Sequence, residues 1–177
     1  MVIFAQTKEP RARIVIRRAF VRATVQPTIT EALATDHAAV RQKIAMMLAM
    51  PRRAAQIYPG VSADLRWHNA AEEQTLYQAM SRFPSMRAQI ERSEDQHAHL
   101  DAMLRRLDVT PFDHPVWMSR FAAARKALED HLAVEETRVF SDARRLLPLP
   151  QQRLLGARYE RLMTEQAEGA KIGAGYG

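Results

Sequence analysis

Apolar residues recur every three or four positions along several long stretches of the chain, a spacing that places them on one face of an α-helix. The first stretch begins at Thr28, where Glu31 three residues later completes a capping-box pattern, and ends before Pro51. A later stretch begins after Pro84 and ends before Pro111. Strand signals are few after Thr28. The pattern therefore predicts an all-α protein.

Two further helices are expected between and after these. Pro59-Gly60 is typical of a loop, so the second helix is predicted to begin near Ser62 or Asp64. Asp113 is the predicted N-cap of the fourth helix, with Pro115 in its first turn. Four helices of about twenty residues, joined by short loops, predict an up-down-up-down four-helix bundle.

A shorter amphipathic fifth helix is expected around residues 154–163, and the Gly-rich end of the chain is expected to fray. The chain therefore divides into three parts. Residues 1–27 form a basic extension, residues 28–147 the bundle, and residues 148–177 a C-terminal helix with a tail.

The positive charge of the chain is concentrated in its first 27 residues. The whole chain carries a formal net charge of +6, and residues 1–27 hold six of the basic residues and one of the acidic ones. The remainder is close to neutral, so nucleic-acid binding is the least favoured partner class, because no base-reading motif accompanies the arginines. Three interpretations of the arm remain: a disordered segment, a basic amphipathic segment against an acidic partner or surface, or an extension without a function of its own. An organelle transit peptide fits less well because the arm lacks Ser.

The chain has 177 residues and no cysteine. The length suits one domain. The absence of cysteine excludes disulfides, thiolate zinc sites, iron-sulfur clusters and cysteine nucleophiles, so His, Asp or Glu must hold any metal. No apolar run reaches transmembrane length, and a cytoplasmic location is expected.

Four of the six histidines fall on the predicted apolar faces, one in each of the four long helices. These are His37, His68, His97 and His131. Any one of them alone could be a core histidine with its ring nitrogens hydrogen-bonded. Four together are costly, since each unpaired buried polar group costs about 1 to 3 kcal/mol.

Two glutamates share these faces. Glu72 follows His68 by four residues, and Glu135 follows His131 by four, so each pair lies on one helix face about 6 Å apart along the axis. Each pair follows a single histidine by a similar interval, 31 residues for His68 and 34 for His131. The chain thus contains two similar helix pairs, each supplying His and then His-x-x-x-Glu.

Four imidazoles and two carboxylates are a donor set for a borderline divalent metal. A single tetrahedral zinc would leave ligands unused, whereas two bridging carboxylates suit two metals, and redox-capable iron uses such a site well. Positions would remain for water, oxide or a diatomic ligand.

At these residues the chain resembles the hemerythrin-like HHE cation-binding domain family, over roughly residues 30–147. The runs after the two glutamates, Glu72-Glu73-Gln-Thr-Leu-Tyr77 and Glu135-Glu136-Thr-Arg-Val-Phe140, are similar to the family's own. The resemblance implies two non-haem iron ions, bridged by oxide or hydroxide and the two carboxylates. It also implies that the partner is a small diatomic or peroxide-type ligand, with roles in oxygen binding, redox or nitric oxide response, or iron handling. No protein partner is indicated.

Two departures from the family pattern affect these implications. Gln78 and Ser141 stand where the family usually has Pro, which bears on how the helices end. Asp101 stands where the invertebrate oxygen carriers have a further His, so reversible oxygen carriage is less favoured. Asp101 is expected to face solvent, with an additional oxygen ligand as the alternative.

The alternative function is a di-iron oxidase or ferroxidase of ferritin-like character. That class requires two Glu-x-x-His motifs, and only Glu94-x-x-His97 fits. A ligand-binding or sensing module is therefore favoured over a dedicated enzyme. Glu73 and Glu136 are expected beside the centre or in solvent, and Tyr77 is expected in the core or near the site. His99 and His114 are expected outside the centre.

Overall fold

The computed structural model describes residues 26–174, and within this range the chain is helical with no β-strand. The long helices are α1 (Ile29–Ala49), α2 (Ala54–Glu72), α4 (Pro84–Asp108), α5 (Trp117–Val134) and α7 (Leu149–Ala174). Shorter elements are a 3-10 turn (Pro51–Arg53), α3 (Gln78–Met80) and α6 (Phe140–Leu146). Two π-helical segments, Glu73–Tyr77 and Glu135–Val139, continue α2 and α5. The predicted extension, residues 1–27, lies outside the described residues except for its last two.

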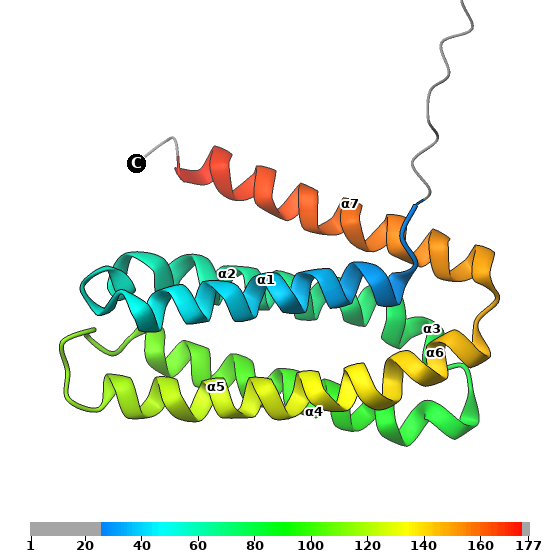
Figure 1. The fold of residues 1–177 in the computed structure, drawn as a ribbon, viewed down its shortest axis with the longest axis horizontal. Coiled ribbons are helices and arrows are strands. Elements are labelled where there is room, and N and C mark those ends of the chain that lie inside the picture. The colour runs from blue at the N-terminus through cyan, green and yellow to red at the C-terminus, as the bar shows by residue number, and fades with distance from the viewer. Residues whose placement is uncertain (1–25, 175–177) are drawn as a thin grey trace, which may run out of the picture.

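The long helices lie side by side in a bundle, as Figure 1 shows. α1 packs on α2, and α4 packs on α5. α7 lies along the outside against α1 and α2. The all-α prediction is confirmed, and the long helices form a helical bundle.

The start of α1 follows its sequence signal. The Thr28 side chain accepts a hydrogen bond from the Glu31 amide, and the Glu31 carboxylate accepts one from the Thr28 amide at 2.8 Å. These bonds hold the pKa of Glu31 below its usual value. The predicted capping box is therefore present.

Two predicted helix starts are wrong. α2 begins at Ala54, so Pro59-Gly60 lies inside a helix and not in a loop. Pro59 and Gly60 are exposed, while the neighbouring Tyr58 and Val61 are buried, and this burial offsets the hydrogen bond that proline removes.

The fourth helix begins later than predicted. α5 starts at Trp117, and Asp113 does not cap it. A cap at Asp113 would put His114 in the first helical turn directly before Pro115, where the α conformation is disfavoured. The chain instead forms a turn, in which His114 Nδ1 accepts a hydrogen bond from the Val116 amide.

The fifth helix is longer than predicted, with 26 residues. It closes on the start of α1 at Gly156. A Cβ at Gly156 would lie 2.2 Å from the carbonyl oxygen of Pro27, so the two backbones meet where only glycine fits. Of the Gly-rich end, residues 175–177 lie outside the described part.

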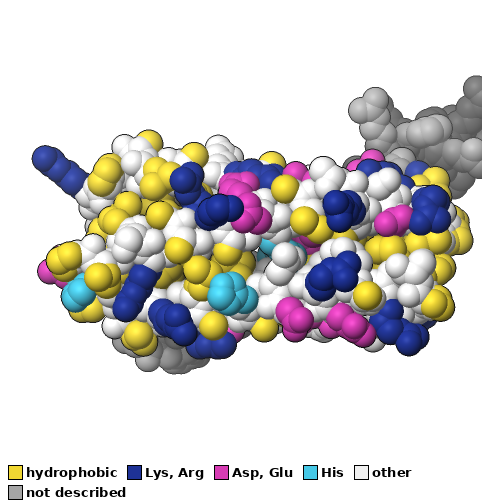
Figure 2. Space-filling view, turned by 90° about the horizontal axis from the view of Figure 1, so that it is seen from below, with side chains coloured by type: hydrophobic (Ala, Val, Ile, Leu, Met, Phe, Trp, Pro, Cys, Tyr) yellow, Lys and Arg dark blue, Asp and Glu magenta, His cyan; other side chains and the backbone are white. Residues whose placement is uncertain are grey.

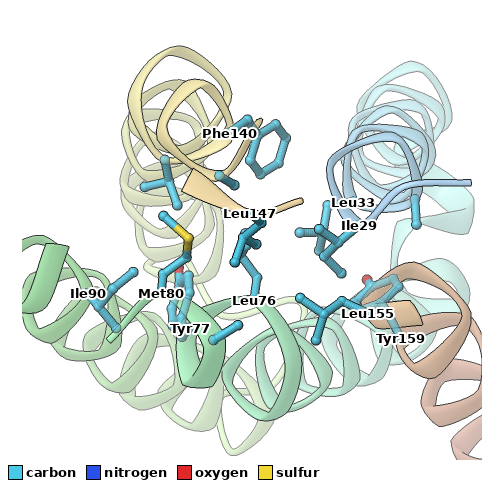
Figure 3. Packing of buried hydrophobic residues seen from close by; sticks show 14 of the residues in the cluster. Ile29, Leu33, Leu76, Tyr77, Met80, Ile90, Phe140, Leu147, Leu155 and Tyr159 are labelled. Carbon is cyan, nitrogen blue, oxygen red and sulfur yellow. The ribbon is translucent and has the colours of Figure 1, made fainter. Parts of the chain in front are cut away.

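The core consists of two apolar clusters. One contains Leu76, Tyr77, Phe140 and Leu155, among others, and joins α7 to the bundle (Figure 3). The other surrounds Trp117 and Phe121 and includes Leu65 and Leu128. On each of the four helices the predicted ligands lie where residues of one cluster give way to residues of the other. A polar layer thus crosses the bundle between two apolar ones.

The two π segments lie at the ends of the two His-x-x-x-Glu motifs. Each contains a threonine whose hydroxyl donates to the carbonyl of an alanine four residues earlier, Thr75 to Ala71 at 2.7 Å and Thr137 to Ala133 at 2.6 Å. A π turn is wider than an α turn and interrupts the regular series of backbone hydrogen bonds. The threonine hydroxyls donate hydrogen bonds to backbone carbonyls next to this interruption.

Candidate metal centre

Six side chains meet in the polar layer between the two apolar clusters. His37 comes from α1, His68 and Glu72 from α2, His97 from α4, His131 from α5, and Glu135 from the start of the second π segment. All six are at most 2% exposed. The structure therefore brings together all six metal ligands that the sequence predicted.

The imidazoles form two pairs. The rings of His37 and His68 have centroids 5.0 Å apart, and those of His97 and His131 lie 4.6 Å apart. Within the second pair the two Nε2 atoms are 2.9 Å apart.

Each carboxylate lies between one member of each pair. Glu72 Oε2 is 3.6 Å from Nε2 of His68 and 3.7 Å from Nε2 of His97. Glu135 Oε2 is 3.4 Å from Nε2 of both His37 and His131. Ligand atoms from Glu72, His97, His131 and Glu135 lie within 4.8 Å of one another, and so do those from His37, His68 and Glu135.

The outer nitrogen of every imidazole has a hydrogen-bond acceptor. His37 Nδ1 donates to Glu136 and His97 Nδ1 to Glu73, both at 2.9 Å. These bonds assign the proton to Nδ1, which leaves Nε2 as a lone pair directed at the centre. Glu73 and Glu136 thus orient two of the predicted ligands, His97 and His37, one of the two roles expected of them.

Glu136 is itself held by a cation. Arg41 donates to Glu136 Oε1 at 2.6 Å and to Glu129 at 3.0 Å. Burial raises the pKa of Glu136, but the hydrogen bonds from Arg41 and His37 outweigh it and hold that pKa below its usual value. The acceptor of His37 therefore stays ionised at neutral pH.

α7 reaches the centre through one tyrosine. His68 Nδ1 lies 2.9 Å from Asp36 Oδ2 and 2.8 Å from the Tyr159 oxygen, and Tyr159 donates to Asp36 at 2.7 Å. Burial raises the pKa of Asp36, but the bonds from His68 and Tyr159 lower it below its usual value overall. Removing α7 would leave Asp36 with His68 alone.

Tyr77 lies against the centre from inside the bundle. Its hydroxyl donates to Glu135 Oε1, and its ring stacks on His97 with centroids 5.2 Å apart. Burial raises the pKa of Tyr77, so the phenol stays protonated and is a donor. It is both a core residue and a neighbour of the site.

Four ionisable groups of the centre, Glu72, Glu135, His37 and His131, have pKa values shifted toward their neutral forms. Burial, together with the charge of Glu135, raises the pKa of Glu72 well above its usual value. Burial also raises the pKa of Glu135, against the hydrogen bond from Tyr77. Burial and neighbouring imidazoles lower the pKa of His37 to about 4 and that of His131 to about 2.

The residues fit a bound cation. Within the described residues, Nε2 of His37 and of His68, both carboxylate oxygens of Glu72, and Oε2 of Glu135 have no hydrogen-bond partner. The facing Nε2 lone pairs of His97 and His131 repel unless a cation or shared proton lies near them. Metal binding would satisfy these atoms, because neutral imidazoles and carboxylates are ligands for divalent first-row metals.

Comparison with known proteins agrees with this geometry. The profile of the hemerythrin HHE cation-binding domain matches residues 28–143, about two thirds of the chain. The chain belongs to the hemerythrin HHE cation-binding domain family. No curated protein and no solved structure is matched. As in its family, this HHE domain carries a cluster of His and Glu that could bind a metal.

Other polar residues considered from the sequence lie outside this cluster of the HHE domain. Asp101 pairs with Arg66 and Arg105 at the surface and does not reach the centre. Glu94 and His99 are exposed.

Three residues that contact the predicted ligands were not found from the sequence. Asp36 and Tyr159 hold His68, and the Gln96 amide oxygen accepts from His131 Nδ1 at 3.0 Å. One of these contacts had a signal in the sequence. Tyr159 lies on the apolar face of the C-terminal helix, and the hydroxyl of a buried tyrosine needs a hydrogen-bond partner.

Among the described residues, no helix is both long enough and apolar enough to cross a lipid bilayer. Figure 2 shows one face of the molecule, where basic and acidic side chains are interspersed and no single-sign surface forms.

Proposed function

We propose that this HHE domain holds two iron ions and binds or reacts with a small oxidant such as O2, NO or a peroxide. His37 and His68 would hold one ion, and His97 and His131 the other. Glu72 and Glu135 would bridge them, with oxide or hydroxide completing the bridge. The helices that carry these ligands would form the expected up-down four-helix bundle, with α7 outside it.

One observation carries this proposal. Each carboxylate contacts one imidazole of each pair, at 3.4 to 3.7 Å. A single metal would need only one pair and one carboxylate, whereas carboxylates shared between two imidazole pairs suit two metals a few ångströms apart. When bound, such ions supply one-electron redox chemistry and open positions for a diatomic ligand.

The protein's own residues would prepare the centre for that chemistry. The Nδ1 bonds to Glu136, Asp36 and Glu73 hold three imidazoles in one tautomer and make Nε2 a stronger donor. Tyr77 donates a hydrogen bond to Glu135 and so fixes the orientation of that carboxylate. The two apolar clusters exclude bulk water from both sides of the layer.

The donor set favours this interpretation over a ferritin-like ferroxidase. That class needs glutamates as half or more of its ligands. Here Glu94, the residue that begins the single Glu-x-x-His match, is exposed and not part of the cluster. We therefore expect binding or sensing of a small ligand, not repeated oxidation of iron.

The test is metal analysis of protein from iron-replete cells, with absorption spectra before and after dithionite. We expect about two iron ions per chain and near-ultraviolet bands that dithionite bleaches. Spectra after addition of NO or O2 to the reduced protein then identify the ligand. A protein that takes up no iron after anaerobic ferrous reconstitution would contradict the proposal, and sustained catalytic consumption of Fe²⁺ would support the ferroxidase instead.

A further inference from the structure

The C-terminal helix places one hydroxyl among the hydrogen bonds of the centre. Tyr159 on α7 is 2% exposed and projects from that helix toward the bundle (Figure 3). Its hydroxyl donates to Asp36 Oδ2 at 2.7 Å, and its oxygen lies 2.8 Å from Nδ1 of His68. A tyrosine hydroxyl has a single hydrogen, so an oxygen that donates to Asp36 accepts from His68. Tyr159 therefore bonds to both members of the Asp36–His68 pair.

This contact comes from outside the matched HHE domain. The family profile covers residues 28–143, and Tyr159 lies beyond them. Gly156, three residues before Tyr159 and on the same side of α7, brings the helix backbone against the start of α1, where an added Cβ would lie 2.2 Å from Pro27 O. This close approach sets how far the Tyr159 hydroxyl reaches into the bundle.

Asp36 needs a second partner because one side of it faces solvent. Its side chain is 24% exposed and lines the cleft between α1 and α7 together with Tyr159. Water competes for the hydrogen bonds of a partly exposed carboxylate. The bond from Tyr159 ends on Oδ2, the same oxygen that accepts from His68. Tyr159 thus fixes the acceptor on which the orientation of His68 depends.

Both acceptors of the His37–His68 pair are held in this way. Arg41 donates to Glu136, the acceptor of the first imidazole, at 2.6 Å. Tyr159 donates to Asp36, the acceptor of the second. Each outer hydrogen bond of this pair is therefore part of a longer chain of bonds that reaches a third side chain.

The acceptors of the His97–His131 pair lack this support. They are Glu73 and Gln96, and both are partly or largely open to solvent. Among residues 26–174, no side chain other than the imidazole donates a hydrogen bond to either of them. The two imidazole pairs are alike in their inner nitrogens and differ in how firmly their outer nitrogens are held.

We propose that Tyr159 is a positioning residue for a metal ion at the His37–His68 pair, and that α7 thereby makes this pair the tighter of the two metal positions. Tyr159 fixes Asp36, and Asp36 fixes the imidazole of His68 with its Nε2 lone pair directed at the centre. Partners that orient metal-bound imidazoles raise metal affinity by about 10- to 100-fold. This inference rests on the proposed pair of metal ions and adds which position binds more tightly and which residue is responsible.

The experiment titrates the metal-free full chain with Co²⁺ and follows absorbance, so that the two ions bind in two resolved steps. Tyr159→Phe keeps the ring and removes the hydroxyl. In this variant we expect the tighter step to weaken about tenfold and the weaker step to change less than about twofold.

Tyr58→Phe is the matched control. Tyr58 is also buried, and its hydroxyl donates to Asp108 at 3.0 Å within the apolar cluster around Trp117. This variant loses the same kind of hydrogen bond and should bind both ions as the wild type does. Gln96→Ala is the mirror test, since it removes the acceptor of His131 and should weaken only the weaker step.

NMR of the Zn²⁺-loaded chain with isotope-labelled histidine gives a readout that a general loss of packing does not imitate. We expect Tyr159→Phe to shift one imidazole Nδ1–H signal, that of His68, and to speed its exchange with water. The Nδ1–H signals of the other three ligand histidines should keep their wild-type positions.

An unchanged tighter step in Tyr159→Phe, or equal weakening in Tyr58→Phe, would overturn the inference. Equal weakening of both steps with shifts of all four signals would also overturn it, because α7 would then act on the stability of the whole bundle. A wild-type chain that binds fewer than two ions at saturation would refute the proposed centre itself, and this inference with it.

Discussion

The four imidazoles of the centre differ in what holds their outer nitrogen. His37, His68 and His97 donate to carboxylates, whereas His131 donates to the amide of Gln96. A carboxylate acceptor makes an imidazole a stronger donor to a metal than an amide does. The His97–His131 pair is therefore expected to donate less electron density to a bound metal than the His37–His68 pair.

The sharpest test at this scale is replacement of one ligand. In His68→Ala we expect iron content to fall below about one ion per chain, because metal affinity depends on the full ligand set. His99→Ala is the control, since His99 is an exposed histidine two residues after His97 and should retain wild-type iron. Metal analysis of both variants after identical reconstitution decides the outcome, and full iron content in His68→Ala would refute the ligand set.

Periodicity could place the six inward residues but not their neighbours. A 3.6-residue repeat says which face of its own helix a residue occupies. It does not say which side chain arrives from another helix. Tyr159 lies 91 residues after His68, and Gln96 lies 35 residues before His131, so only packing reveals these contacts.

Helix boundaries were harder to predict than the helices themselves. The capping box at Thr28 is a local interaction and was readable. Pro59 suggested a loop, but burial of Tyr58 keeps the helix continuous through it. Asp113 suggested a helix start, but Pro115 disfavours the α conformation just after it, so the helix begins later. The π segments had no readable signal, since their wide turns depend on packing of the residues around the site.

The contact of α7 with the start of α1 gives a prediction at the scale of the element. Gly156→Ala places a Cβ 2.2 Å from Pro27 O and 2.9 Å from the Thr28 carbonyl carbon, so α7 must move. We expect a loss of about 1 to 3 kcal/mol in the free energy of unfolding, measured by urea denaturation.

Gly60→Ala is the control for that substitution. Gly60 is exposed in the interior of α2, and a Cβ there meets nothing within 4 Å. It should gain about 0.5 to 1 kcal/mol, as alanine does over glycine in helices. Loss of stability in both variants would show that the close approach at Gly156 is not the cause.

For the whole molecule, the polar layer connects metal binding to folding. The ligand atoms converge only in the native state, so a metal stabilises the native state selectively. At a free ferrous concentration of 100 times the Kd, the gain is about 2.7 kcal/mol, or a rise in Tm of about 5 to 10 °C. Anaerobic thermal unfolding with and without Fe²⁺ measures it, and equal Tm values would count against a site in the core.

The same stabilisation should grow with pH. The raised pKa of Glu72 and of Glu135 means that these carboxyl groups retain protons to higher pH than a free glutamate does, and a metal competes with those protons. His37, with a pKa of about 4, and His131, at about 2, are already neutral above pH 5 and release no proton. The metal-induced rise in Tm is therefore expected to be larger at pH 8 than at pH 6, and the reverse order would contradict the assigned carboxylate shifts.

The all-α bundle was predictable because its helices bury continuous apolar faces that the sequence displays directly. The extent of α7 was not. Its ends depend on docking against α1 and α2, and its own apolar face, read alone, indicated only residues 154–163.

The two helix pairs repeat one arrangement. α1 with α2, and α4 with α5, each supply His, then His-x-x-x-Glu, then a π segment whose threonine bonds back to an alanine carbonyl. A π turn adds one residue to a turn of helix, and it occurs within one position of the same place in both halves. The chain therefore uses the same local solution twice, and each half contributes two imidazoles and one carboxylate to the polar layer.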